Sequence, residues 1–215
     1  MAVTARILGD LEESQTLNDA SIAINRARPG TAAELASMWP RIASGFLSLH
    51  AGRLDEAERR LRRVADFLGD RRSFGNYRNS ANIGLGLVAL ARGERGEARR
   101  ILEGALTDPV HLYPYTHVHA LLGLAQIAHE DGDIAARDRL LRQALRFAGR
   151  RGLLEEYIAS ITLVGRMRPA AAPFDTLLQS VLEYVRSISL EAAVKQLLAL
   201  SAAEKLDTGL APSGD

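Results

Sequence analysis

The chain has 215 residues, a quarter of which are charged, and its formal net charge is +1. Such a balance points neither to nucleic acid nor to a membrane surface as a partner. The absence of cysteine excludes a disulfide framework and a thiolate metal site. Aromatic residues make up 5 % and β-branched residues are few, so strands are not expected. We see no signal peptide and no apolar run near the roughly 18 residues of a membrane span. The composition therefore predicts a soluble, cytoplasmic, all-α protein.

The first part of the chain predicts two helices separated by a proline–glycine break. Residues 10–27 form the first, and a longer helix is expected over 32–51. Thr31 and Glu34 have the spacing of a capping box at the start of this second helix. Pro40 lies inside it, so we expect a kink at that point or a true start there.

A glycine turn separates this helix from a third one, predicted over about 54–68. Gly52 is placed to take the left-handed conformation that ends many helices. On the outer face, acidic residues precede arginines by four positions, which is the favourable order for helical ion pairs. The predicted pairs are Asp55–Arg59, Glu56–Arg60 and Glu58–Arg62.

The same pattern recurs twice further along the chain. The turn glycines Gly52, Gly93 and Gly132 are separated by 41 and then 39 residues. A period in this range is typical of stacked helical repeats, in which each pair of helices buries its apolar face against its neighbours. In the third copy Arg137 falls where the pattern has a small residue, unless the helix slips so that Ala136 serves.

The order small, glycine, small, large and small at these spacings resembles the tetratricopeptide repeat (TPR). The matching residues are Gly45, Gly52, Ala57, Leu61 and Val64 in the first copy, and Gly86, Gly93, Ala98, Leu102 and Ala105 in the second. Close packing is expected where the small residues Gly45 and Ala57 meet. The repeats are longer than the usual 34 residues, a form that resembles the sensor region of bacterial transcription activators of the MalT type.

This resemblance, which covers roughly residues 9–150, implies a right-handed α-solenoid of TPR-like helix pairs with a C-terminal helical cap. We expect the repeats over 1–150, capping helices over 151–206 and a disordered tail over 207–215. It also implies that the first helix of each pair lines a concave groove, which holds a protein segment or a small effector. The groove residues predicted on this alignment are Trp39, Phe46, His50, Asn79, Asn82, Tyr115, His119 and Gln126. For Trp39, Phe46 and His119, a place in the core is the alternative.

The chain shows no motif that would carry chemistry. No nucleophilic side chain is followed or preceded by a general base at a spacing typical of a catalytic motif, so no catalytic residue and no cofactor are predicted. His117 and His119 are two residues apart and point about 200° apart on a helix, so they cannot bind one metal from one face. The arginine runs are interleaved with acids, which favours a solvated surface over direct contact with nucleic acid.

The predicted function is that of a non-enzymatic binding module in a bacterial regulatory protein, with a protein or peptide partner or a small effector. Two alternatives stay open on the sequence. One is a homo-oligomerising scaffold, in which a second copy covers an open end of the stack. The other is an enzyme or small-molecule binder of a biosynthetic pathway, acting around Tyr115 and His119.

Overall fold

The computed structural model describes residues 11–27, 30–69, 74–107 and 113–151, which fold into helices joined by short turns. No strand occurs among these residues, which confirms the predicted all-α class. None of the described helices is long and apolar enough to cross a membrane. Apart from Arg151, the predicted cap and tail lie outside the described residues. The helices are α2 (Leu11–Arg26), α3 (Thr31–His50), α4 (Leu54–Leu68), α5 (Gly75–Ala91), α6 (Arg95–Leu106), α7 (Pro114–Glu130) and α8 (Ile134–Arg151).

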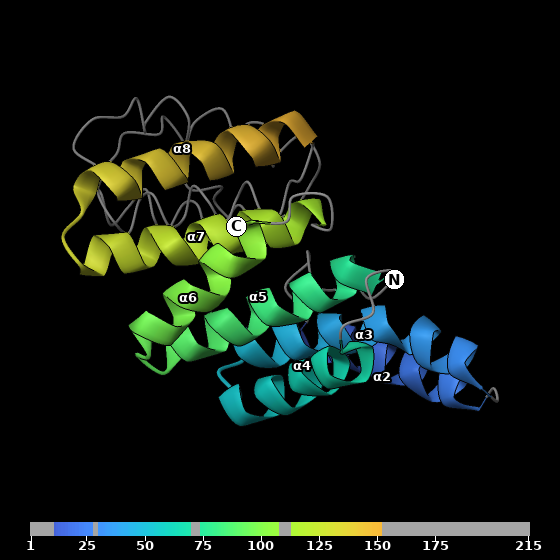
Figure 1. The fold of residues 1–215 in the computed structure, drawn as a ribbon. Helices are drawn as coiled ribbons and strands as arrows, with labels where there is room; N and C mark the ends of the chain where they lie inside the picture. Colours follow the sequence, from blue (N-terminus) through green and yellow to red (C-terminus); the bar gives the residue numbers. More distant parts are fainter. Residues whose placement is uncertain (1–10, 28–29, 70–73, 108–112, 152–215) are drawn as a thin grey trace, which may run out of the picture.

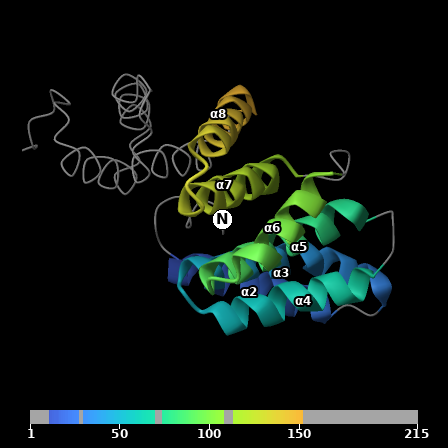
Figure 2. The ribbon, with the colours of Figure 1, turned by 60° about the vertical axis from the view of Figure 1, so that its left-hand side comes forward.

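The helices stack in chain order as successive hairpins. Each helix contacts the next one along the chain, and the first helices of the pairs, α3, α5 and α7, also contact one another in that order. Figure 1 shows the stack running from α2 and α3, in blue, to α8, in orange. Figure 2 shows the same order after a rotation of 60°. This arrangement is an α-solenoid; its right-handedness stays a prediction.

The three turns between paired helices share one backbone geometry. Gly52, Gly93 and Gly132 have φ angles of 72°, 81° and 77°, as predicted for the left-handed end of a helix. In the first turn, the amide of Arg53 donates to the carbonyl of Ser48 over 2.8 Å. In the other two turns the amides of Glu94 and Asp133 likewise donate to the carbonyl five residues earlier, each over 2.9 Å. Only glycine takes this conformation without strain, which is why the period in the sequence follows these residues.

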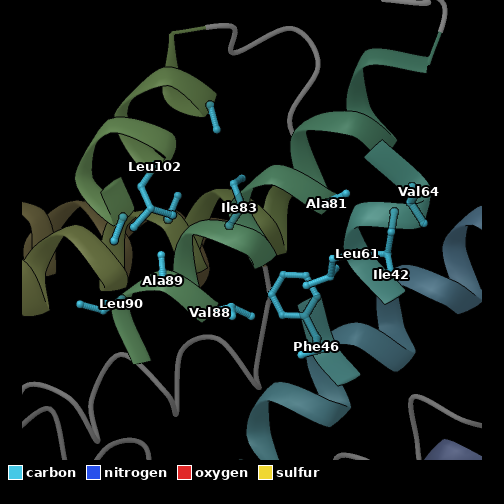
Figure 3. Close-up of a cluster of buried hydrophobic side chains, with 14 of the residues drawn as sticks. Ile42, Phe46, Leu61, Val64, Ala81, Ile83, Val88, Ala89, Leu90 and Leu102 are labelled. Atoms are coloured by element: carbon cyan, nitrogen blue, oxygen red, sulfur yellow. The ribbon is translucent and has the colours of Figure 1, made fainter. Parts of the chain in front are cut away.

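Glycines make room for a leucine at the centre of each repeat contact. A Cβ atom at Gly45 of α3 would lie 2.6 Å from Cγ of Leu61, and one at Gly84 of α5 would lie 2.7 Å from Leu61 Cδ1. Leu61 is fully buried there, beside the ring of Phe46 (Figure 3). Gly45 thus accommodates the larger side chain of Leu61. The predicted contact between Gly45 and Ala57 stays a prediction.

The second repeat contact has the same construction. A Cβ atom at Gly86 of α5 would lie 2.9 Å from Leu102 Cδ2, and one at Gly123 of α7 would lie 2.8 Å from Leu102 Cδ1. Leu102 is fully buried between these helices. We call the space that two such glycines leave for one leucine a notch. One glycine of each notch belongs to the leucine's own helix pair and the other to the next pair, so the leucine joins two neighbouring repeats.

The start and middle of α3 differ from the prediction. The helix runs through Pro40, which is therefore not its start. Proline has no N–H to offer to the carbonyl of Ala36, and the side-chain amide of Asn25 on α2 donates to that carbonyl instead, over 3.3 Å. The capping box is not formed, because Thr31 is already helical and no side chain caps this end. Glu34 binds the guanidinium of Arg41 at 3.0 Å.

The ion pairs on α4 are formed in part as predicted. Arg60 pairs with Glu56 at 2.7 Å, and Arg62 pairs with Glu58. Asp55, however, reaches across to Arg92 of the next repeat at 2.6 Å. Arg59, the predicted partner of Asp55, makes no ion pair with any described residue. These links between repeats have no counterpart in a pattern read along one helix.

Arg137 occupies the position that holds a small residue in the other repeats. It is only 3 % exposed, while Ala136 is half-buried, so α8 keeps the register of the pattern and does not slip. The guanidinium pairs with Asp138 at 2.7 Å and lies 3.5 Å from Nδ1 of His129. A buried arginine is tolerated here because it is paired.

Candidate functional site: an aromatic face on the first helices

Four half-buried rings gather on one side of the stack, and we call them the aromatic face: Trp39 of α3, Tyr77 of α5, Tyr113 and Tyr115. The ring centroid of Trp39 lies 5.3 Å from that of Tyr113 and 5.0 Å from that of Tyr115. Tyr113 is also 5.8 Å from Tyr77. These distances are typical of attractive aromatic pairs. The first and third repeats thus meet directly through side chains, across the helix α5 that separates them.

Two predicted histidines continue this face along α3 and α7. His119 lies next to Phe46 and His50, with centroid distances of 5.5 Å and 6.4 Å. The exposed His50 has its Nδ1 atom 2.7 Å from the carbonyl of Phe46, which accepts a hydrogen bond from it. Phe46 itself is 3 % exposed and packs in the core, so its predicted place on the groove surface is corrected. The structure shows the alternative that the sequence left open for Phe46, a position in the core.

The predicted asparagines lie elsewhere. Asn79, which is 8 % exposed, and Asn82 line an open cavity of about 710 Å³ between α4, α5 and α6. The sequence predicted that the two asparagines share a groove with the rings of the aromatic face, and the structure places them elsewhere. Gln126 follows Tyr115 and His119 along the same stripe of α7, and its amide donates to Glu130 over 3.1 Å. The structure brings together the predicted residues of α3 and α7 and separates those of α5.

The tyrosines give the aromatic face its polar character. Burial, with a hydrogen bond to Tyr77, raises the pKa of Tyr113 to about 12. The phenol is therefore neutral throughout the physiological range and can both donate and accept a hydrogen bond. Tyr77 and Tyr113 were not among the predicted site residues. The cluster of tyrosines around Pro114 was the available signal, but only the fold shows that these rings reach Trp39.

His117 and His119 lie on opposite sides of α7, as their spacing predicts. His119 contacts α3, whereas the ring of His117 stacks on Phe147 of α8 with centroids 4.5 Å apart. Burial lowers the pKa of His117. No group of three or more metal-ligating side chains occurs among the described residues.

The depressed pKa of His117 predicts a pH-dependent contribution to stability. The fold favours the neutral imidazole, so this contribution is present above the unfolded-state pKa of about 6.5 and is lost as the pH falls below it. We expect thermal unfolding of the wild type to shift to lower temperature between pH 7.5 and 5. The shift should be smaller in His117→Phe, which cannot titrate. Equal shifts in both proteins would show that this histidine is not involved.

Comparisons with known proteins agree with the helical hairpins. Residues 38–63 and 80–103 match the family model of the tetratricopeptide repeat. The chain therefore contains tetratricopeptide repeats in the α3–α4 and α5–α6 pairs. No curated protein matches the chain.

Among solved structures, the chain is similar in fold to the TPR-like repeats of a putative kinesin light chain from Podosopora anserina. The TM-score is 0.51 at 17 % identity, and 95 % of this chain and 92 % of that one are covered. That structure is of a form with a single substitution; a second structure of the same repeats gives the same TM-score and identity, with 93 % of its chain covered. These likenesses concern the fold. Tetratricopeptide repeats are in general non-catalytic scaffolds that mediate protein–protein interactions.

Proposed function

We propose that the chain is a protein-interaction module that holds an extended segment of a partner protein across the aromatic face. The observation that carries this proposal is the gathering of half-buried rings from α3, α5 and α7, centred on Trp39. Tryptophan and tyrosine are enriched among the residues that supply most of the binding energy at protein interfaces. Their rings offer large apolar area, and their polar groups bind the edges of a partner's backbone.

The side chains around the aromatic face describe the kind of segment that fits. The four rings of the aromatic face are uncharged at neutral pH, and we expect them to favour apolar and aromatic side chains over charged ones. The exposed His50 and the half-buried Gln126 lie further along the same helices and supply polar contacts. We expect an uncharged segment with at least one apolar or aromatic anchor.

The proposal extends to the setting in which the module acts. Repeats near 40 residues, as set by the turn glycines, favour the middle part of a cytoplasmic bacterial regulatory protein of the MalT type. The predominance of arginine over lysine in the sequence agrees with a GC-rich bacterial source. A small effector bound at the same face is the alternative ligand in such a protein.

The test is capture of a partner from lysate of the source organism by immobilised protein. We expect at least one protein to be retained by the wild type and lost with Trp39→Ala. Truncation of an aromatic interface anchor costs about 2 kcal/mol or more, which lowers affinity by more than tenfold. A second variant, His50→Ala, removes an exposed side chain and should weaken capture without changing the melting temperature.

The matched control is Phe147→Ala, which removes a half-buried ring from α8, away from the aromatic face. Capture should survive this change. If the same proteins are retained by the wild type, by Trp39→Ala and by His50→Ala, the aromatic face is not the binding surface. Loss with all variants, including Phe147→Ala, would show that general destabilisation and not the face is responsible.

A further inference from the structure

A second cavity lies between α2, α3 and α4. These helices lie together at one end of the stack (Figures 1 and 2). It is open to solvent and has a volume of about 910 Å³. It does not belong to the aromatic face, because Arg41, which lines it, is two residues from Trp39 and points to the other side of α3. Its charged lining consists of six arginines against three carboxylates: Arg26, Arg41, Arg59, Arg60, Arg62 and Arg63 against Asp19, Glu56 and Asp66.

The three carboxylates of the lining offset half of the six positive charges, and two of them bind the same arginine. Asp19 and Glu56 both bind Arg60, at 2.8 Å and 2.7 Å. By contrast, Arg26, Arg59 and Arg63 make no ion pair with any residue that the structure describes. The sequence predicted that the arginine runs are balanced by neighbouring acids. The structure shows that this holds for Arg60, for Arg62, which pairs with Glu58, and for Arg41, which pairs with Glu34. The excess positive charge is therefore carried by Arg26, Arg59 and Arg63.

Arg41 is the buried member of this group. It is 7 % exposed, and its Nη2 atom binds Glu34 at 3.0 Å. Its Nε atom is buried and has no hydrogen-bond partner. Burial lowers the pKa of this guanidinium, and Arg26 and Arg63 lower it further, while Glu34 raises it. A buried donor without a partner is costly, and Arg41 is the lining residue of the cavity that carries one.

We propose that this cavity binds the phosphoryl group of a small molecule, with Arg41, Arg26 and Arg63 as its ligands. A guanidinium offers paired N–H donors that match the oxygens of a phosphoryl group. A dianionic group with three terminal oxygens can use several such donors at once, whereas a carboxylate has a single charge and two oxygens. The site goes beyond the protein-interaction function and does not depend on it.

The shape and lining of the site favour a compact anion over a nucleic-acid backbone. Arg41 is buried, so only a small group that enters the cavity can reach its donors. Binding of nucleic acid relies on many exposed cations that contact successive phosphates.

Isothermal titration of the full chain with pyrophosphate tests this assignment. We expect saturable binding to the wild type. Arg63→Gln removes an exposed guanidinium from the cavity and should weaken the affinity by about tenfold or more, since a hydrogen bond to a charged group is lost. Arg41→Gln should have at least the same effect. The control, Arg146→Gln, removes an exposed arginine of α8 outside the cavity and should change the affinity less than about twofold.

Three results would overturn the proposal. The first is the absence of pyrophosphate binding to the wild type at millimolar concentration. The second is an equal loss in Arg63→Gln and Arg146→Gln, which would show attraction by general positive charge. The third is a duplex DNA that binds more tightly than pyrophosphate and loses affinity in Arg63→Gln. If Arg41→Gln fails to fold, Arg63→Gln decides alone. None of these results affects partner capture through Trp39.

Discussion

Leu61→Ala is expected to cost about 2–5 kcal/mol of the free energy of unfolding, the range for leucine truncation in a well-packed core. Leu61 is fully buried and fills the notch formed by Gly45 and Gly84. Neither glycine has a side chain that could move into the space, so the cavity cannot collapse easily. Because the notch spans two repeats, the change should also loosen the contact between α4 and α5. Urea denaturation followed by circular dichroism measures the loss.

The matched control is Leu54→Ala on the same helix. Leu54 lies seven residues earlier on the same stripe of α4 and is half-buried. The same truncation there removes less buried area and should cost clearly less than Leu61→Ala. If the two variants lose the same stability, the notch has no special role in joining the repeats.

Gly45→Leu is expected to destabilise by about 3 kcal/mol, at the upper end of the usual cost of overpacking. Even a Cβ atom at this position would lie 2.6 Å from Leu61 Cγ, so the first carbon already clashes and the rest of the side chain has no space. The rigid helices α3 and α4 would have to separate. A calorimetric scan should show a marked drop in melting temperature.

The control for this clash is the same substitution at Gly104 of α6. A Cβ atom at Gly104 would meet nothing within 4 Å, and this residue is exposed. Replacing a helical glycine with leucine should there raise stability by about 0.5–1 kcal/mol, through helix propensity alone. Opposite signs at the two positions are the prediction. A destabilised Gly104→Leu together with an unchanged Gly45→Leu would refute the packing described for the repeat.

The helical hairpins were predictable because their determinants are local. Each turn needs a glycine with positive φ, and Gly52, Gly93 and Gly132 meet this need at regular intervals. The contacts between repeats were not predictable in the same way. Gly84 and Gly123 complete the notches for leucines of the preceding repeat, and no spacing within one repeat reveals them. The Asp55–Arg92 ion pair escaped prediction for the same reason.

The sequence placed candidate site residues on α3, α5 and α7, and the structure brings together those of α3 and α7 but not those of α5. Trp39, Tyr115 and His119 come together as their places on the first helices suggested. On α5, however, Tyr77 faces these residues while Asn79 and Asn82 line a cavity on another side of the helix. A first helix contacts both neighbouring repeats and its own partner, so residues only two positions apart point to different surfaces.

The arginine cavity shows a further limit of sequence patterns. Acids four residues before arginines predicted a neutral, solvated face. Asp55 pairs instead with Arg92, and Arg41, on a mainly apolar helix, brings one more positive charge into the cavity from α3. Excess charge at this point arises from three helices together. It is therefore a property of the fold and not of any one segment.

The most direct test of the proposed interaction module locates the partner on its surface. The capture experiment would be repeated with a photo-reactive side chain in place of His50, next to the aromatic face, and in a second protein in place of Gly104 on α6. We expect a cross-linked partner from position 50 and none from position 104. A partner cross-linked from position 104, or from neither position, would contradict the assignment of the binding surface to α3, α5 and α7.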